Sequence, residues 1–209
     1  MQATECSTAT LDRRAVRRDS IIEAAARRFA GAGYAQCDMD CVAAEAGVAK
    51  GTLYLYFPGK EELFYACVDR GMQQLMQAVF AAADTATEPL DRIGRAIRAY
   101  LTFFDEHPHY VELLIQERAS FRDRKRSTYF EHRDANRGPW RELYGKLVAD
   151  STFRNDIAVE RMLDTIGNLL YGTMFTNRFN GRSVSLDEQY SALMKIVLQG
   201  MLRDRALVV

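Results

Sequence analysis

The chain has 209 residues, of which 48% are hydrophobic and 27% are charged, and its 28 basic residues balance 28 acidic ones. That length and apolar content suit one or two compact units with a real core. The zero net charge excludes a general polycation that coats nucleic acid but permits a local basic face, and no apolar run approaches the roughly 20 residues that a membrane span needs. We therefore expect a cytoplasmic protein with no membrane partner.

The N-terminal part of the chain is expected to be helical after a short tail. Residues 1–9 are small and polar and lack the apolar core of a signal peptide, so we expect a flexible tail over residues 1–12. The first helix is predicted from about Arg14 to Gly31, because glycine is favoured where a helix closes. Two short helices, at about residues 39–46 and 50–56, follow on either side of Gly47.

Longer helical patterns fill the rest of the chain, and each of the four prolines lies near a boundary between them. The predicted helices cover about residues 60–83, 88–106, 108–120, 140–150, 158–179 and 186–202, and the charged stretch 121–137 is expected to be helical only in part. No segment alternates strictly between apolar and polar residues, as an amphipathic strand does. The sequence therefore predicts an all-α fold.

Residues 38–57 have the pattern of a helix-turn-helix, in which two short helices meet at a tight turn. Asp38 is a natural N-cap, Gly47 permits a positive φ in the turn, and Val42 and Leu53 supply apolar faces between the helices. The second helix of such a pair enters the major groove of DNA. Its exposed face offers hydroxyl and amine donors suited to phosphate oxygens: Lys50, Thr52, Tyr54 and Tyr56.

From about Arg17 to Val68 the sequence resembles the DNA-binding domain of the TetR/AcrR family of bacterial repressors. The resemblance rests on the string Ala43-x-x-Ala46-Gly47-Val48-x-Lys50-Gly51-Thr52-Leu53-Tyr54-x-Tyr56-Phe57-x-x-Lys60-Glu61-x-Leu63 and on the preceding Phe29-Ala30-x-x-Gly33-Tyr34. This string is far more specific than a lone helix-turn-helix pattern, and it covers about a quarter of the chain. It implies a three-helix DNA-binding domain over residues 13–60, followed by a helical ligand-binding and dimerisation domain over residues 61–209.

The resemblance also assigns contacts to DNA. By position it gives base or phosphate contacts to Lys50, Gly51, Thr52, Tyr54, Tyr56 and Lys60, and a phosphate clamp to Cys37. The chain departs from the family at Cys37-Asp38, where Thr followed by Ser or Thr is common, and at Ala49, where Ser is common. Each departure removes a donor to phosphate. We therefore expect the leading side of this motif to grip DNA differently from its relatives.

Four arginines lie within residues 13–18, just before the predicted first helix. They either contact phosphate or enter the minor groove, as N-terminal arms do elsewhere, or they form a solvated helix start. On the first interpretation Arg17 joins the candidate DNA contacts.

The resemblance implies that the last two long helices pair with their copies in a homodimer. Apolar stripes on both helices agree with this role, and the alternative is that they form the core of a monomer. The candidate interface consists of Leu163, Ile166, Leu170 and Met174 on the first helix and Tyr190, Leu193, Val197 and Met201 on the second.

The resemblance further implies a ligand pocket among the middle helices. Binding sites are mostly apolar with a few polar groups, and aromatic residues are frequent here, although each taken alone is equally at home in a plain core. Glu117 lies in an otherwise apolar helix and is a candidate reader of a charged ligand. The candidate pocket residues are Phe103, Phe104, Tyr110, Leu114, Glu117, Trp140, Tyr144, Tyr171 and Phe175.

These observations predict a ligand-responsive DNA-binding transcriptional regulator, a repressor that a small molecule releases from a palindromic operator. The alternative is an all-helical small-molecule binding protein or enzyme without DNA binding, and activation in place of repression stays open. No catalytic residue, metal site or cofactor is expected, since no phosphate-binding loop or catalytic signature occurs. Cys37 and Cys41 share a helix face, which leaves a thiol switch as an alternative to two ordinary free thiols.

Overall fold

The computed structural model describes the backbone of residues 2–202 and side chains from residue 13 onward. In this part of the chain the secondary structure is helical, apart from an isolated bridge between Phe153 and Leu202. The all-α prediction is confirmed. The helices are α1 (Gln2–Ala32), α2 (Met39–Glu45), α3 (Lys50–Tyr56), α4 (Lys60–Asp84), α5 (Pro89–Glu106), α6 (Pro108–Ser120), α7 (Thr128–Ala135), α8 (Gly138–Ala149), α9 (Val159–Asn180) and α10 (Leu186–Met201).

Helix α1 begins earlier than the sequence predicts, because it is already helical at Gln2, where we expected a tail up to residue 12. Residues 2–12 contain neither proline nor glycine, so nothing in the sequence interrupts a helix there. The arginines of residues 13–18 therefore lie on a continuous helix and not on an extended arm. Among the described helices, none is long and apolar enough to cross a membrane.

The described chain divides into two compact units. The first contains the chain up to Met72 together with Glu112–Thr128, and the second contains Gln73–Val111 together with the chain from Tyr129 onward. The division falls inside α4 and α6 and not near residue 60, because the first turns of α4 belong to the core of the first unit. In that core Phe64 is fully buried and its ring lies 5.2 Å from the ring of Phe29.

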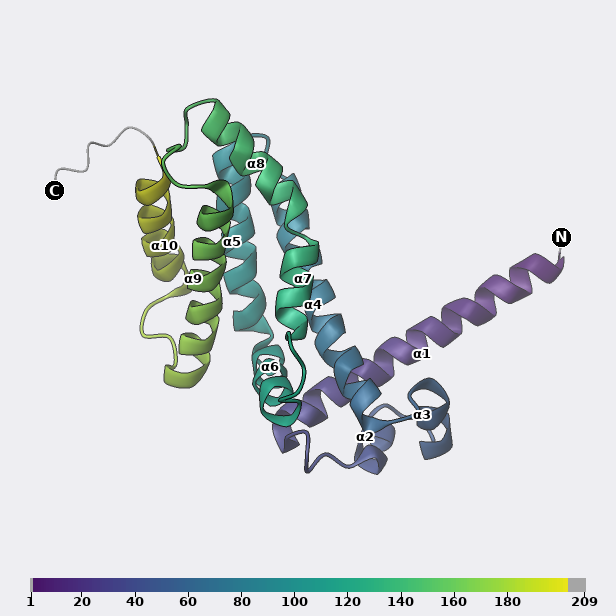
Figure 1. Cartoon of the computed structure of the whole chain (residues 1–209). Helices are drawn as coiled ribbons and strands as arrows, with labels where there is room; N and C mark the ends of the chain where they lie inside the picture. Colours follow the sequence, from purple (N-terminus) through teal and green to yellow (C-terminus); the bar gives the residue numbers. More distant parts are fainter. Residues whose placement is uncertain (1, 203–209) are drawn as a thin grey trace. The chain divides into compact units, whose positions relative to one another are not determined.

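Within the first unit, α1 packs on α2, and α2 packs on α3 (Figure 1). Arg27 and Arg28 on α1 both bind the carboxylate of Glu45 at the end of α2, with nitrogen–oxygen distances of 3.1 and 2.5 Å. The end of α6 belongs to the same unit, and there Gln116 donates a hydrogen bond of 2.8 Å to the carbonyl oxygen of Phe29. These contacts hold the two short helices on a larger helical base.

Within the second unit, α5 packs against both α9 and α10, and α8 packs against α9 (Figure 1). Asn177 on α9 and Gln189 on α10 exchange two side-chain hydrogen bonds of 2.9 Å. The start of α10 is fixed by a capping box, in which Ser185 and Glu188 bond to each other's backbone N–H groups. The unit is thus a bundle whose apolar faces meet between α5, α8, α9 and α10.

The charged stretch that we expected to be only partly helical contains α7. This helix begins at Thr128, whose backbone N–H and hydroxyl donate to the buried carboxylate of Glu117 at 3.0 and 2.6 Å. Arg124 donates to the same carboxylate at 2.7 Å. A carboxylate at a helix N-terminus satisfies donors that the helix itself leaves unpaired.

Candidate DNA interface and ligand cavity

The helix-turn-helix forms where the sequence predicts it. Asp38 caps α2 by accepting a hydrogen bond of 2.8 Å from the backbone N–H of Asp40. Gly47 has a φ of +65°, a conformation that costs other residues energy, and the N–H of Val48 then bonds to the carbonyl oxygen of Ala43 at 2.9 Å. This turn directs α3 away from α2 with Leu53 fully buried beneath it.

The outer face of α3 carries a cation, a hydroxyl and an apolar side chain. Four of its residues are exposed, and the exposed fraction of Leu55 is 79%: Lys50, Gly51, Tyr54 and Leu55. Thr52 and Tyr56 are partly exposed at its edges. Leu55 was not predicted as a contact, because a leucine in a short helix is usually assigned to the core. An exposed apolar group nevertheless suits the methyl group of thymine.

Lys50 is paired within the motif itself. Its Nζ lies 2.6 Å from Oδ1 of Asp40 on α2, and both side chains are more than half exposed. Hydrogen bonding to this carboxylate raises the pKa of Lys50, so the ammonium stays charged at neutral pH. The leading side of the interface therefore presents a cation whose charge is partly balanced by an adjacent carboxylate.

The arginines of α1 lie beside the end of α3. The guanidinium of Arg14 is 5.7 Å from the centre of the Tyr56 ring, and that of Arg18 is 5.1 Å from the centre of the Phe57 ring. Arg17 is exposed and lines a shallow hollow with Ser20 and the turn residues. Such cation–π contacts place positive charge next to the recognition helix.

Two of the residues that we assigned to phosphate contact are otherwise engaged. Cys37 is only 4% exposed, because its side chain faces the core of the first unit and not the surface, so the phosphate clamp expected at Cys37 is wrong for its thiol. Burial also raises the pKa of this thiol. Lys60 donates a hydrogen bond of 3.0 Å to the carbonyl oxygen of Ala35, and its Nζ lies 5.1 Å from the centre of the Tyr34 ring.

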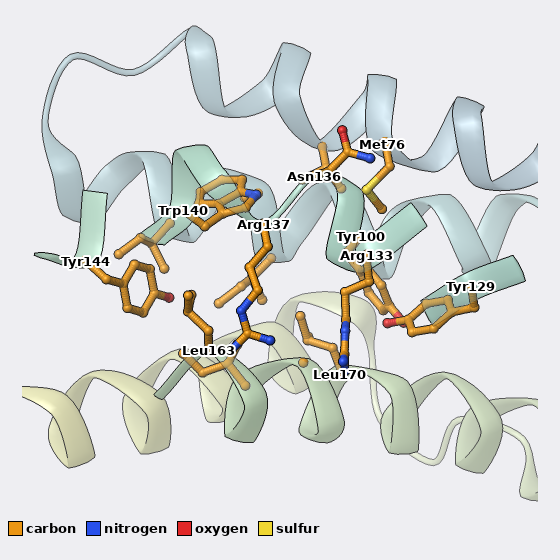
Figure 2. A pocket seen from close by; sticks show the side chains of 16 residues that line it. Met76, Tyr100, Tyr129, Arg133, Asn136, Arg137, Trp140, Tyr144, Leu163 and Leu170 are labelled. Atoms are coloured by element: carbon orange, nitrogen blue, oxygen red, sulfur yellow. The ribbon is translucent and has the colours of Figure 1, made fainter. Parts of the chain in front are cut away.

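The second unit contains an apolar cavity of about 140 Å³ between α4, α5, α7, α8 and α9 (Figure 2). Apolar side chains from all five helices form most of its wall. Its polar groups come from α5, from α7, from the α7–α8 segment and from α8. The residues that line it are Met76, Val79, Ile93, Ala96, Ile97, Tyr100, Tyr129, Arg133, Asn136, Arg137, Trp140, Tyr144, Leu163, Ile166, Gly167 and Leu170.

Only two of the predicted pocket residues, Trp140 and Tyr144, line this cavity. Glu117 and Leu114 are buried in the first unit, where Glu117 binds the start of α7, so neither reads a ligand here. The remaining five aromatics also lie outside the cavity wall, because each packs against other rings of the second unit: Phe103, Phe104, Tyr110, Tyr171 and Phe175.

Most polar groups of the cavity were not predicted from the sequence. Arg133 and Arg137 are four residues apart, a spacing that would place them on one side of a continuous helix, but their charged surroundings led us to expect only partial helix over residues 121–137. Tyr100 and Tyr129 are buried, and their hydroxyl oxygens lie 3.0 Å apart. The spacing of Arg133 and Arg137 is the one signal that pointed to this wall.

The predicted dimer residues lie on the sides of α9 and α10 that face the interior of the second unit. Leu163, Ile166 and Leu170 line the cavity. The hydroxyl of Tyr190 lies against Gly94 of α5. The other four are buried, because the apolar stripe that we read as an interface packs on α5: Met174, Leu193, Val197 and Met201.

A helix-turn-helix with an exposed, donor-bearing second helix defines a DNA-binding protein. Residues 21–67 match the family described as bacterial regulatory proteins, tetR family. The HTH-type transcriptional repressor KstR2 of Mycolicibacterium smegmatis is 29% identical over 148 residues, which cover 70% of this chain and 72% of the relative. The HTH-type transcriptional activator FasR of the same organism is 32% identical over 100 residues, which cover 48% of this chain and 46% of the relative.

Solved structures agree on the fold. The fatty acid degradation regulator FadR from Bacillus halodurans has a TM-score of 0.75 and 20% identity, over 88% of this chain and 95% of that one. Over residues 21–67 the chain is similar to the TetR family, and it is a DNA-binding transcriptional regulator. Its relatives are regulators and not enzymes, so the enzyme alternative is not supported.

Proposed function

We propose that the protein is a ligand-responsive repressor that binds a palindromic operator as a homodimer. The observation that carries this proposal is the pairing, in one chain, of a donor-bearing recognition helix with a separate apolar cavity. A small molecule in that cavity releases the protein from DNA. It does so only if it binds the DNA-free conformation more tightly than the DNA-bound one.

The DNA contacts of this proposal come from α3 and its surroundings. Lys50, Tyr54 and Thr52 donate to phosphates or bases, and Leu55 contacts a thymine methyl group. Exposed Arg17, together with the partly exposed Tyr56, extends the interface. Gly51 is exposed and has no side chain, so α3 can approach the DNA closely at this position.

The dimer of this proposal uses the outer faces of α9 and α10. Leu169, Phe179 and Ile196 are 38%, 65% and 68% exposed, which is unusual for large apolar side chains on regular helices. Gly172 on α9 and Gly200 on α10 have open space around them, so a partner helix can approach closely there. A symmetric dimer presents its two recognition helices to successive turns of DNA, about 34 Å apart, and its operator is therefore palindromic.

Repression is favoured over activation by the more extensive match, since the repressor KstR2 aligns over 70% of this chain and the activator FasR over 48%. Two proteins of similar fold are a ketosteroid transcriptional regulator from Mycobacterium tuberculosis and a fatty acid degradation regulator from Bacillus halodurans. An apolar effector of that general kind agrees with the wall of the cavity described above.

The test is selection of bound duplexes from a random-sequence DNA library. We expect a palindrome to be enriched, and we expect its affinity to fall steeply as salt rises, because phosphate contacts release counterions. Lys50→Ala with Tyr54→Ala should abolish binding and leave the circular dichroism spectrum unchanged. Lys146→Ala, an exposed lysine on α8, is the control and should bind normally. Failure to enrich any sequence, or full binding by the double variant, refutes the proposal.

A further inference from the structure

We propose that the cavity of the second unit binds a small carboxylic acid, with an apolar body among the aliphatic and aromatic side chains and a carboxylate held by Arg133 and by the Tyr100–Tyr129 hydroxyl pair. This inference rests on the proposed function only in taking the cavity as the effector site. It adds the chemical class of the effector and the residues that read it.

The size and wall of the cavity favour a compact apolar body. Its volume is about 140 Å³, close to that of an apolar cavity known to bind benzene, at roughly 150 Å³. Trp140, Met76, Ile93 and Leu163 contribute apolar surface from four helices. A body of one ring or a short alkyl chain fits such a space.

One of the two hydroxyl protons of the tyrosine pair lacks a strong acceptor. Tyr100 and Tyr129 are 5% and 4% exposed, and their hydroxyl oxygens lie 3.0 Å apart, so one hydroxyl donates to the other. The other contact of the Tyr100 hydroxyl is the sulfur of Met174 at 3.9 Å, and a thioether is a weak acceptor. A ligand oxygen at this place would accept a hydrogen bond that the protein alone does not complete.

Both hydroxyls are donors at neutral pH. Burial raises the pKa of Tyr100 well above its ordinary value and raises that of Tyr129 to about 12. The two groups therefore stay protonated, and this end of the cavity favours an acceptor over a donor.

Arg133 adds a positive charge to the same wall. Figure 2 shows its side chain extending from α7 across the cavity toward Leu170 of α9. It lies close to Gly167 of α9, where an added Cβ would be in ordinary van der Waals contact with Nη1 of Arg133, at 3.7 Å. Its Nε and Nη2 both lie 3.1 Å from a single oxygen of Asp134, the next residue on α7. Nη1 of Arg133 therefore faces α9 and does not take part in the pairing with Asp134.

Arg137, the other arginine of the wall, is less suited to a ligand. Its two terminal nitrogens lie 2.6 Å from Asp164 and 2.8 Å from Glu160, so two carboxylates balance its charge. Arg133 pairs with one carboxylate, that of Asp134, and is therefore the arginine of the wall with more charge available to an anion. Arginine and a carboxylate form strong charge-assisted hydrogen bonds, and the neighbouring tyrosine hydroxyl supplies a third donor.

Isothermal titration calorimetry on the full chain tests this assignment with matched probes. 3-Phenylpropanoate and 4-phenylbutan-2-one have nearly the same shape, and the ketone replaces the carboxylate with a neutral acceptor. 3-Phenylpropan-1-ol replaces it with a neutral hydroxyl, which both donates and accepts. Octanoate keeps the carboxylate and changes the body. We expect both acids to bind at least tenfold more tightly than the ketone and the alcohol, because a hydrogen bond to a charged group is the stronger one.

Variants of the cavity wall measure how much Arg133 and Tyr129 each contribute to binding of the acid. Arg133→Gln should weaken binding of 3-phenylpropanoate by about 10- to 100-fold and leave binding of the ketone nearly unchanged. Arg133→Lys should restore part of the loss, and Tyr129→Phe should weaken the acid by about tenfold or less. Lys146→Gln is the control, because Lys146 is exposed on α8 and lies outside the cavity wall.

Several results would overturn the inference. If neither acid binds, or if the ketone binds as tightly as its isosteric acid, the cavity does not read a carboxylate. Equal binding of 3-phenylpropanoate by the wild type and Arg133→Gln would remove Arg133 from the site. In each case the wild type would still bind the selected DNA, so these failures are distinct from a failure of the proposed function.

Discussion

Nζ of Lys50 lies 2.6 Å from Oδ1 of Asp40, so the cation at the start of the recognition helix is already paired before any DNA is bound. Both side chains are exposed, and exposed ion pairs contribute little to stability. The pair matters for recognition, because phosphate must compete with Asp40 for Lys50 and because Asp40 itself repels the DNA backbone.

Asp40→Asn should therefore raise the affinity for DNA. The substitution removes the competitor and one negative charge while keeping a side chain of the same size. We expect a tightening of roughly two- to fivefold at low salt, which shrinks as salt screens the interaction. Fluorescence anisotropy on the selected duplex at several salt concentrations measures it. Weaker binding by Asp40→Asn would show that Asp40 positions Lys50 and does not oppose the DNA.

Gly47→Ala should destabilise the helix-turn-helix through the backbone alone. Nothing lies within 4 Å of the added Cβ, but the φ of +65° is unfavourable for alanine, at a cost of about 1–2 kcal/mol. Urea unfolding measures the loss. Gly145→Ala, in a helix and also with open space, is the control and should stabilise by about 0.5–1 kcal/mol. Equal effects of the two substitutions would contradict the explanation.

Glu117→Gln should lower the free energy of unfolding by about 1–3 kcal/mol, because it leaves charged and polar donors at a buried site with a poorer acceptor. The carboxylate is 2% exposed and accepts from Thr128 and Arg124. Chemical denaturation followed by circular dichroism checks the value. Glu23→Gln, an exposed change on α1, should leave stability within about 0.5 kcal/mol of the wild type.

The thiols should differ sharply in reactivity. Cys41 is exposed, whereas Cys37 and Cys67 are buried and burial raises the pKa of both thiols. A raised pKa lowers the thiolate fraction at neutral pH, and the thiolate is the reactive form. In a Cys6→Ser variant, a colorimetric thiol reagent should label one cysteine quickly and the other two only on unfolding. Fast labelling of Cys37 would revive the alternative of a thiol switch.

Ile196→Asp should shift the protein from dimer to monomer if the outer faces of α9 and α10 form the interface. Ile196 is 68% exposed, so the charge should leave the fold of one chain intact while opposing association. Analytical ultracentrifugation measures the mass, and the same variant should lose DNA affinity. Ala81→Asp, an exposed change on α4, should leave the mass unaltered. A dimer that tolerates Ile196→Asp would place the interface elsewhere.

The DNA-binding half could be predicted from the sequence because its signals are local. Asp38 and Gly47 fix a cap and a turn within ten residues, and each acts through its own backbone. The exposed apolar group of Leu55 escaped this reasoning, since a short helix gives too few turns to separate its faces. Burial of Cys37 depends on contacts with other elements, which a position in a motif does not reveal.

The second half could be predicted only as a set of helices. Periodicity identified the apolar stripe of α9, but Leu163 and Leu170 are as suitable for a cavity wall as for a dimer interface. What decides between the two is the neighbouring helix. Helix α7 was not predicted for two reasons. The residues around Arg133 are densely charged, and the carboxylate that caps the helix belongs to Glu117, eleven residues before the first residue of the helix.

The anchor of α7 gives the cavity a short covalent route to the DNA-binding unit. Thr128 is held by Glu117 at the end of one unit, and Tyr129, the next residue, presents its hydroxyl at the wall of the cavity in the other. A molecule that displaces Tyr129 thus also pulls on Thr128, the residue before it, which is hydrogen-bonded to the Glu117 carboxylate. Thr128→Val removes the hydrogen bond from the Thr128 hydroxyl to Glu117. We expect this variant to bind both the ligand and the DNA, but we expect the ligand no longer to release it from DNA.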